Sequence, residues 1–197
     1  QASNGFTYRL ALVDGTDHAF FNLDTATGQL SLKAQPDYET KASYSISVVS
    51  TDEGKKSYSK AFEISISDVN ETPTITSTGI TLSSEDGAYT YTLAASDVDS
   101  GDTVTYAATT LPSWLSFNAG TGVLSGTPTN SEVGTHSVVL TATDSNSAVS
   151  TQSFTITVSN VNDAPTVTST TVTSSTEDSA YSYTFAASDV DSGDTMT

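Results

Sequence analysis

The chain has 197 residues, with 6 Lys and Arg against 23 Asp and Glu, no Cys, and a formal net charge of −17. This acidity disfavours nucleic acids and anionic membrane surfaces as partners, because both select basic patches. The lack of Cys excludes disulfide bonds and a thiol nucleophile. No apolar run approaches the ~18 residues that a membrane-spanning helix needs. The length allows one large domain or two modest ones.

Alternation of apolar and polar residues with a period of two predicts strands along the chain. These strands cover 43–50, 60–67, 136–143 and 153–159. Thr-Gly steps at 27–28 and 121–122 supply turns. No convincing helical period is present, and about seven short strands per repeat are typical of a Greek-key β-sandwich. Trp114, Leu115 and Phe117 are expected in the core of the middle sandwich.

An internal repeat divides the chain. The segment 75–105 recurs at 167–197, so that Glu85 is matched by Glu177, 92 positions later. The linker DVNETP at 68–73 recurs as NVNDAP at 160–165 with the same offset. Repetition at a fixed period indicates an array of similar domains.

Three domains are expected from this period. They are an incomplete domain at 1–73 that lacks its first two strands, a complete one at 74–165, and the first strands of a third repeat at 166–197. A sandwich without two of its strands exposes edges that can accept a strand. Two explanations stay open for the truncated ends: an arbitrary cut from a longer array, or strand exchange between identical chains.

Carboxylates cluster at the boundaries of the repeat. In Asp97-Val98-Asp99, two acidic side chains lie on the same side of an extended segment because side chains alternate. Like charges at short range repel, and a divalent cation resolves that repulsion. Calcium takes six to eight oxygen ligands from carboxylates, amides and backbone carbonyls. A D-x-D that recurs with the repeat therefore predicts calcium.

These motifs resemble those of cadherin repeats. The first domain is similar through NGFTYRL at 4–10, FFNLDTATGQLSL at 20–32 and DYE at 37–39. The middle domain is similar to dystroglycan-type cadherin-like repeats through the segment 111–146. Such repeats are common in bacterial surface adhesins, including those of the RTX type. The resemblance implies an all-β fold of tandem Greek-key β-sandwich domains, cadherin- or immunoglobulin-like.

The resemblance also implies a set of Ca²⁺ ligands at each junction. For the first junction they are Asp37, Glu39, Asp68, Asn70, Glu71, Asp97, Asp99 and Asp144. For the second junction they are Glu85, Glu132, Asn160, Asn162, Asp163, Asp189 and Asp191. Because Asn160 replaces an acid, and Glu132 is the only acid left of an upstream pair, we expect fewer or weaker ions at the second junction.

The expected function is structural. We expect a calcium-rigidified extender of an extracellular adhesin at the cell surface, serving biofilm-type attachment, and no enzymatic activity. Its expected partners are neighbouring repeats of the same or identical chains and a surface carbohydrate or protein, without nucleic acid or membrane insertion. Two alternatives stay open: a carbohydrate-binding module of a glycan-degrading system, and a filament or surface-layer subunit assembled head-to-tail by strand complementation.

Overall fold

The computed structural model describes residues 5–11 and 16–195. Part of the motif at 4–10 therefore lies outside the described residues, at Asn4. Within the described part of the chain, the only helical pieces are the 3-10 turns η1 (His18–Phe20) and η2 (Asn130–Glu132). The chain divides into two compact units, residues 1–71 with 98–101 and residues 72–97 with 102–197.

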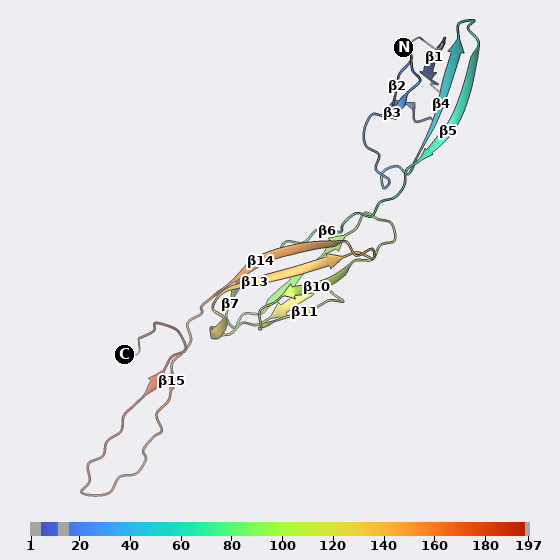
Figure 1. The fold of residues 1–197 in the computed structure, drawn as a ribbon. Helices are drawn as coiled ribbons and strands as arrows, with labels where there is room; N and C mark the ends of the chain where they lie inside the picture. The colour runs from blue at the N-terminus through green and yellow to red at the C-terminus, as the bar shows by residue number, and fades with distance from the viewer. Residues whose placement is uncertain (1–4, 12–15, 196–197) are drawn as a thin grey trace. The chain divides into compact units, whose positions relative to one another are not determined.

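The first unit contains two antiparallel sheets (Figure 1). One has the order β1 (Phe6–Leu10), β4 (Ser43–Asp52) and β5 (Ser57–Ser65), and the other pairs β2 (Phe21–Leu23) with β3 (Leu30–Leu32). The alternation of β4 turns one face toward a small apolar core.

The core of the first unit is only partly closed. Phe21, Tyr44 and Ile46 are buried in it. The apolar side chains packed around them are only half-buried, and they are Leu10, Leu30, Leu32, Ile64 and Ile66. Some of the apolar surface of this unit therefore still faces solvent.

The second unit is a fuller sandwich. Its larger sheet has the order β10 (Thr105–Thr110), β13 (Gly134–Thr143), β14 (Val149–Ser159) and β7 (Leu82–Ser84). The facing sheet has the order β11 (Leu115–Asn118), β12 (Val123–Gly126) and β8 (Tyr89–Thr92). All pairs are antiparallel except β14 with β7, which run parallel.

The core between these two sheets is closed. Its buried side chains include Leu93, Leu124, Leu140 and Ile156, each at most 1% exposed. The expected core position of Leu115 is confirmed, and Trp114 and Phe117 pack against the core as partly buried residues.

Two short strand pairs repeat within the second unit. β6 (Thr74–Ile75) pairs with β9 (Ala95–Ser96), and β15 (Thr166–Val167) pairs with β16 (Ala187–Ser188), 92 positions later. The repeat seen in the sequence is thus a repeat of backbone structure.

The predicted fold class is confirmed, and β4, β5, β13 and β14 overlap the four predicted strands. The division at 73 and 165 stays a prediction. The compact units part at residue 72, close to the first expected boundary, whereas residues 166–197 group with the middle repeat.

We predict that the closed core contributes more stability than the partly closed one. Leu124→Ala removes a side chain that is fully buried, and such changes cost about 2–5 kcal/mol. Leu30→Ala is the matched control, because Leu30 is the half-buried residue at the same place in the first unit. Trp114, the single Trp, reports unfolding of the second unit by fluorescence.

Leu124→Ala should lower the urea midpoint of the Trp114 transition, and Leu30→Ala should leave that midpoint nearly unchanged. Equal shifts from both variants would contradict the division of the chain into two separately packed units.

Candidate metal centres

A buried group of carboxylates lies in the second unit, where the middle repeat meets the segment 166–197. Oxygen atoms of Glu85, Asp163 and Asp191 all lie within 4.8 Å of one another. Glu85 is 2% exposed and Asp191 is 7% exposed. Burying an ionised carboxylate without a compensating charge is costly, so this group needs a compensating partner.

Three distant segments supply these side chains. Glu85 directly follows β7, and its backbone N–H donates to the carbonyl of Ser159 at 3.0 Å. Asp163 lies in the linker after β14, and Asp191 lies in the loop after β16. The fold thus brings Glu85 close to residues that lie 78 and 106 positions later in the sequence.

Backbone donors hold part of the group in place. The N–H of Val161 donates to Oε1 of Glu85. The N–H of Asp163 donates to Oδ2 of Asp191 at 2.6 Å, and the N–H of Asp191 donates to Oδ1 of Asp189 at 2.9 Å. Oε2 of Glu85 is also buried, but it has no hydrogen-bond partner. An orphaned carboxylate oxygen in a buried acidic group is a feature that a bound cation would explain.

The charges in this group also act on one another. Burial raises the pKa of Asp163 above its usual range, and the nearby carboxylates of Asp191, Asp86, Glu85 and Asp189 raise it further. The concentrated negative charge therefore opposes ionisation, and a cation would relieve it. The donors are all oxygen atoms, which fit a hard cation such as calcium.

A second group lies in the first unit. Oxygen atoms of Glu39, Asp68, Glu71 and Asp99 lie within 4.8 Å of one another. The N–H of Glu71 donates to Oδ2 of Asp99 at 2.9 Å. The first three residues are exposed and Asp99 is half-buried. Burial and the carboxylates of Glu39, Asp99 and Asp68 raise the pKa of Glu71.

Eight predicted ligands lie outside both groups, and two of these, Asp37 and Glu132, are carboxylates with local hydrogen-bond partners. Asp37 accepts hydrogen bonds from the N–H and the hydroxyl of Thr40, both at 3.0 Å, and so closes a turn. Glu132 accepts from the N–H and the hydroxyl of Thr129 at 2.8 and 2.6 Å, in a capping box that opens η2. These carboxylates already have structural partners.

The predicted amide ligands Asn70 and Asn162 form local hydrogen bonds, and the predicted ligands Asp97 and Asp144 also lie outside the two groups. Asn70 and Asn162 each donate from Nδ2 to the carbonyl of the next residue, at 2.8 and 2.9 Å. Asp144 is buried and accepts from the N–H of Ala148 at 2.8 Å. Asp97 lies in the second unit, directly after β9.

One residue beside the buried group of Glu85, Asp163 and Asp191 contributes through an amide. Asn130 donates from Nδ2 to Oδ1 of Asp191 at 3.2 Å and to Oδ1 of Asn160 at 3.3 Å. Asp194 was missed by sequence reasoning, although it forms an acidic group with Asp189 and Asp191. The signal was available, because the whole run DVDSGDT, and not only its D-x-D, recurs after 92 residues.

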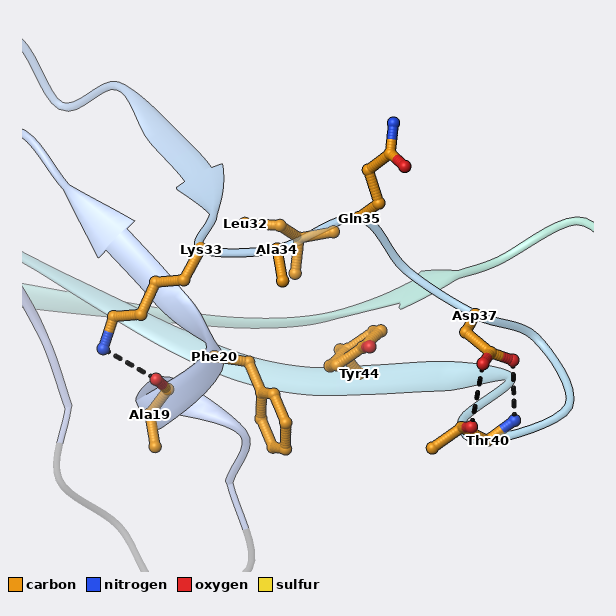
Figure 2. A pocket seen from close by; sticks show the side chains of 9 residues that line it. All are labelled: Ala19, Phe20, Leu32, Lys33, Ala34, Gln35, Asp37, Thr40 and Tyr44. Atoms are coloured by element: carbon orange, nitrogen blue, oxygen red, sulfur yellow. Dashed lines mark hydrogen bonds between the residues drawn. The ribbon is translucent and has the colours of Figure 1, made fainter.

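A separate cavity of about 320 Å³ lies in the first unit. Figure 2 shows the rings of Phe20 and Tyr44 in its lining, with Asp37 bonded to Thr40 at one end. The ring centroids lie 5.4 Å apart in an edge-on arrangement. Phe20 is 49% exposed, so the cavity offers one accessible aromatic surface.

Comparison with known proteins supports the architecture. Residues 72–159 match the family model described as "He_PIG: Putative Ig domain". A "Serine-rich adhesin for platelets" of Staphylococcus aureus is 35% identical over 94 residues, which make up 48% of this chain and 4% of the adhesin. The chain therefore spans only a small fraction of the curated relatives that it matches.

Solved cadherin structures share the fold over most of the chain. Protocadherin Gamma B2 extracellular cadherin domains 3-6 align with a TM-score of 0.61 and 23% identity, over 98% of this chain and 50% of that chain. Human CDH23 EC21-23 aligns with a TM-score of 0.59 and 22% identity, over 96% and 70% of the two chains. The chain therefore shares the fold of cadherin domains.

These similarities are to adhesion and structural modules, and they confirm the prediction that the chain is not an enzyme. Within the described residues, no helix has the length and apolarity needed to cross a lipid bilayer.

In the metal-free protein, Asp163→Asn should weaken the pH dependence of thermal stability. The pKa of Asp163 is raised on folding, so its contribution is present below the unfolded pKa and is lost as pH rises through the folded pKa. With chelator present, the wild type should lose more thermal stability than the variant as pH rises above the unfolded pKa of about 3.9.

Asp24→Asn serves as a control of opposite sign. Hydrogen bonds from the N–H groups of Thr27 and Ala26 lower the pKa of Asp24. Its contribution is therefore present at neutral pH and is lost as pH falls. Identical pH profiles of stability for the wild type and Asp163→Asn would show that folding does not raise the pKa of Asp163.

Proposed function

We propose that this chain is a calcium-rigidified extender segment of an extracellular adhesin. The observation that carries the proposal is the buried carboxylate of Glu85, whose Oε2 has no hydrogen-bond partner and which lies in a group with the carboxylates of Asp163 and Asp191. Similarity to a staphylococcal surface adhesin and to cadherin domains supports the adhesion-type setting.

The residues present fit calcium. Glu85, Asp163 and Asp191 offer three carboxylates within a short distance, and calcium completes its shell with carbonyl and water oxygens. Bound there, the ion would neutralise the repulsion that raises the pKa of Asp163. This chain's own part is to present the three carboxylates from β7, from the linker after β14 and from the loop after β16.

Such an ion would stiffen the junction because its ligands come from both repeats. Extracellular calcium modules bind with dissociation constants of about 10⁻⁴–10⁻³ M. An ion at roughly a hundred times its dissociation constant stabilises the folded form by about 2.7 kcal/mol. That is sufficient to hold a short linker in one conformation.

The exposed group of Glu39, Asp68, Glu71 and Asp99 is the proposed second centre. Its four carboxylates provide more charge than the three of the buried group, whereas its exposure lets water screen that charge. The relative calcium affinity of the two centres therefore depends on both the number of charges and their burial.

The setting and the partners are part of the same proposal. We place the chain at the cell surface, in a protein that serves biofilm-type attachment, with neighbouring repeats as its immediate contacts. A carbohydrate ligand is the second candidate function, because the cavity beside Phe20 combines an exposed ring with the polar side chains of Gln35 and Thr40.

Calcium should raise the thermal midpoint of the wild type, and Glu85→Gln should remove most of that increase. The amide keeps the size of the side chain and removes its charge. Glu132→Gln is the matched control, because the Glu132 carboxylate is already used in the capping box. It should lower the midpoint in chelator only slightly, because glutamine can also close a capping box, and it should keep the increase with calcium.

The experiment is a calcium titration of the thermal midpoint, combined with metal analysis of the dialysed protein. A wild type that gains no stability with calcium, or a Glu132→Gln variant that loses the response as fully as Glu85→Gln, would contradict the assignment of this centre.

Rigidity is tested separately by small-angle scattering. Calcium should narrow the distribution of maximum dimensions of the chain relative to chelator, because a fixed junction samples fewer orientations. The Glu85→Gln variant should retain a broader distribution in calcium than Glu132→Gln does. An unchanged distribution would leave the ion without a role in extension.

A further inference from the structure

The side-chain amide of Asn130 lies between two acceptor oxygens beside the buried group of carboxylates. Its Nδ2 donates to Oδ1 of Asp191 at 3.2 Å and to Oδ1 of Asn160 at 3.3 Å. An amide nitrogen carries two hydrogen atoms, so these two bonds use both of them. The opposite orientation of the amide would set its oxygen against the Asp191 carboxylate, and the neighbours therefore select the donor orientation. The Nδ2 group thus joins two oxygens that a hard cation would join in the same way.

The turn that carries Asn130 is fixed to the backbone beside the buried group. Asn130 is the first residue of η2, which a capping box opens. Pro128, two residues earlier, is fully buried, and its carbonyl accepts the N–H of Asp86 at 2.8 Å. Because Asp86 directly follows Glu85 in the sequence, η2 is attached to the same stretch of backbone that presents the buried carboxylate.

The oxygens of the buried group differ in how far they are already satisfied. Oδ1 of Asp191 accepts from Asn130, and Oδ2 accepts from the N–H of Asp163 at 2.6 Å. In Glu85, Oε1 accepts from the N–H of Val161, whereas Oε2 is buried without a hydrogen-bond partner. A cation compensates a buried carboxylate best at the oxygen that no donor satisfies. The hydrogen bonds therefore direct a cation to Glu85 and away from the Asn130 side of Asp191.

The corresponding place in the first unit is occupied by carboxylates. The position of Asn160 is held there by Asp68, 92 positions earlier. The position of Asp191 is held by Asp99, at the same offset. Oxygens of both lie within 4.8 Å of each other, in one group with Glu39. Carboxylates this close repel one another, so the first unit has charge to neutralise where the second unit has a hydrogen-bonded amide.

We propose that the Asn130 amide takes the place of a cation between Asp191 and Asn160, so that the buried centre holds one calcium ion and not two. That one ion binds on the side of Glu85, and this part of the inference rests on the proposed function. Asn130 is then a positioning residue, because it fixes Asp191 through hydrogen bonds and contacts no ion.

An amide in place of an ion changes how the junction responds to calcium. The two hydrogen bonds of Asn130 hold Asp191 at every calcium concentration. An ion holds its ligands only when free calcium exceeds its dissociation constant. The contact between η2 and the loop after β16 therefore persists in chelator, whereas the contact through Glu85 depends on calcium.

Asn130→Asp exchanges the amide nitrogen for an oxygen and should reverse this arrangement. The new carboxylate lies against the oxygens of Asp191 and Asn160. Three oxygens then converge where two hydrogen bonds were, and such a set suits a hard cation. Without calcium, the added charge repels the Asp191 carboxylate and lowers the stability of the fold.

Calorimetric titration with calcium, together with metal analysis of the dialysed protein, counts the ions bound per chain. Asn130→Asp should bind one calcium ion more than the wild type. In chelator, its thermal midpoint should lie roughly 5 °C below that of the wild type, the scale of a lost hydrogen bond in a domain of this size. Calcium should then raise the midpoint of the variant by more than it raises that of the wild type.

Asn160→Asp is the matched variant, because it adds the same charge to the same hydrogen-bonded side chains. Its carboxylate still accepts from Nδ2 of Asn130, so the number of bound ions should stay that of the wild type. A count of acids alone predicts the opposite. On that count, Asn160→Asp restores the acid found at Asp68 and gains calcium as Asn130→Asp does.

Asn130→Ala separates positioning from metal ligation. It removes both hydrogen bonds and adds no charge, so it should lower the midpoint in chelator and leave the number of ions unchanged. It also decides the question where Asn130→Asp does not fold in chelator. Asn118→Asp controls for added charge, because Oδ1 of Asn118 accepts the N–H of Gly120 in the turn between β11 and β12. It should change neither the midpoint nor the number of ions appreciably.

An unchanged ion count in Asn130→Asp, an equal gain in Asn160→Asp, or the loss of an ion in Asn130→Ala overturns the proposal. The last outcome would make the Asn130 amide oxygen a ligand. A calcium response that Glu85→Gln removes, without any gain in Asn130→Asp, would support the proposed function and overturn this inference. A wild type that binds no calcium, while Asn130→Asp binds one ion, would contradict the proposed function and support the role of Asn130.

Discussion

An ionised carboxylate can be buried only where other groups compensate its charge, and this constraint governs the junction between the middle repeat and the segment that follows it. Glu85 is almost completely buried. One of its oxygens receives a backbone N–H from Val161, and the other receives no hydrogen bond. Carboxylate oxygens of Glu85, Asp163 and Asp191 lie within 4.8 Å of one another, so the conformation of the junction depends on what balances their charge.

A second constraint is that an apolar sheet face needs a facing layer. The second unit meets it with the segment 76–94, and its core residues Leu124 and Ile156 are fully buried. The first unit meets it only in part, which leaves Phe62 exposed. Similar strand patterns therefore give a fully buried core where a facing segment packs on the sheet, and a half-buried one in the first unit of the structure.

Sequence reasoning predicted the all-β fold well, because alternation in stretches such as 43–50 and 136–143 is a local property that the sheet preserves. It predicted the acidic groups through D-x-D and the linkers for the same reason. It did not predict that the Glu132 carboxylate would cap η2. Thr129 and Glu132 form a capping box there, and a carboxylate used in this way is not free to bind a metal ion.

The two junctions differ in a way that counting acids does not capture. The expectation of a weaker second junction rests on the replacement of an acid by Asn160 and on the loss of another acid upstream. Burial works in the opposite direction, because a carboxylate that has already been dehydrated attracts a cation more strongly than one screened by water. Asn160 and Asn130 are hydrogen-bonded beside Asp191, so that an amide pair holds this carboxylate without adding repulsion. Fewer charges in a drier and better-ordered site can equal more charges in an exposed one, and the rank of the two centres depends on desolvation as much as on the number of acids.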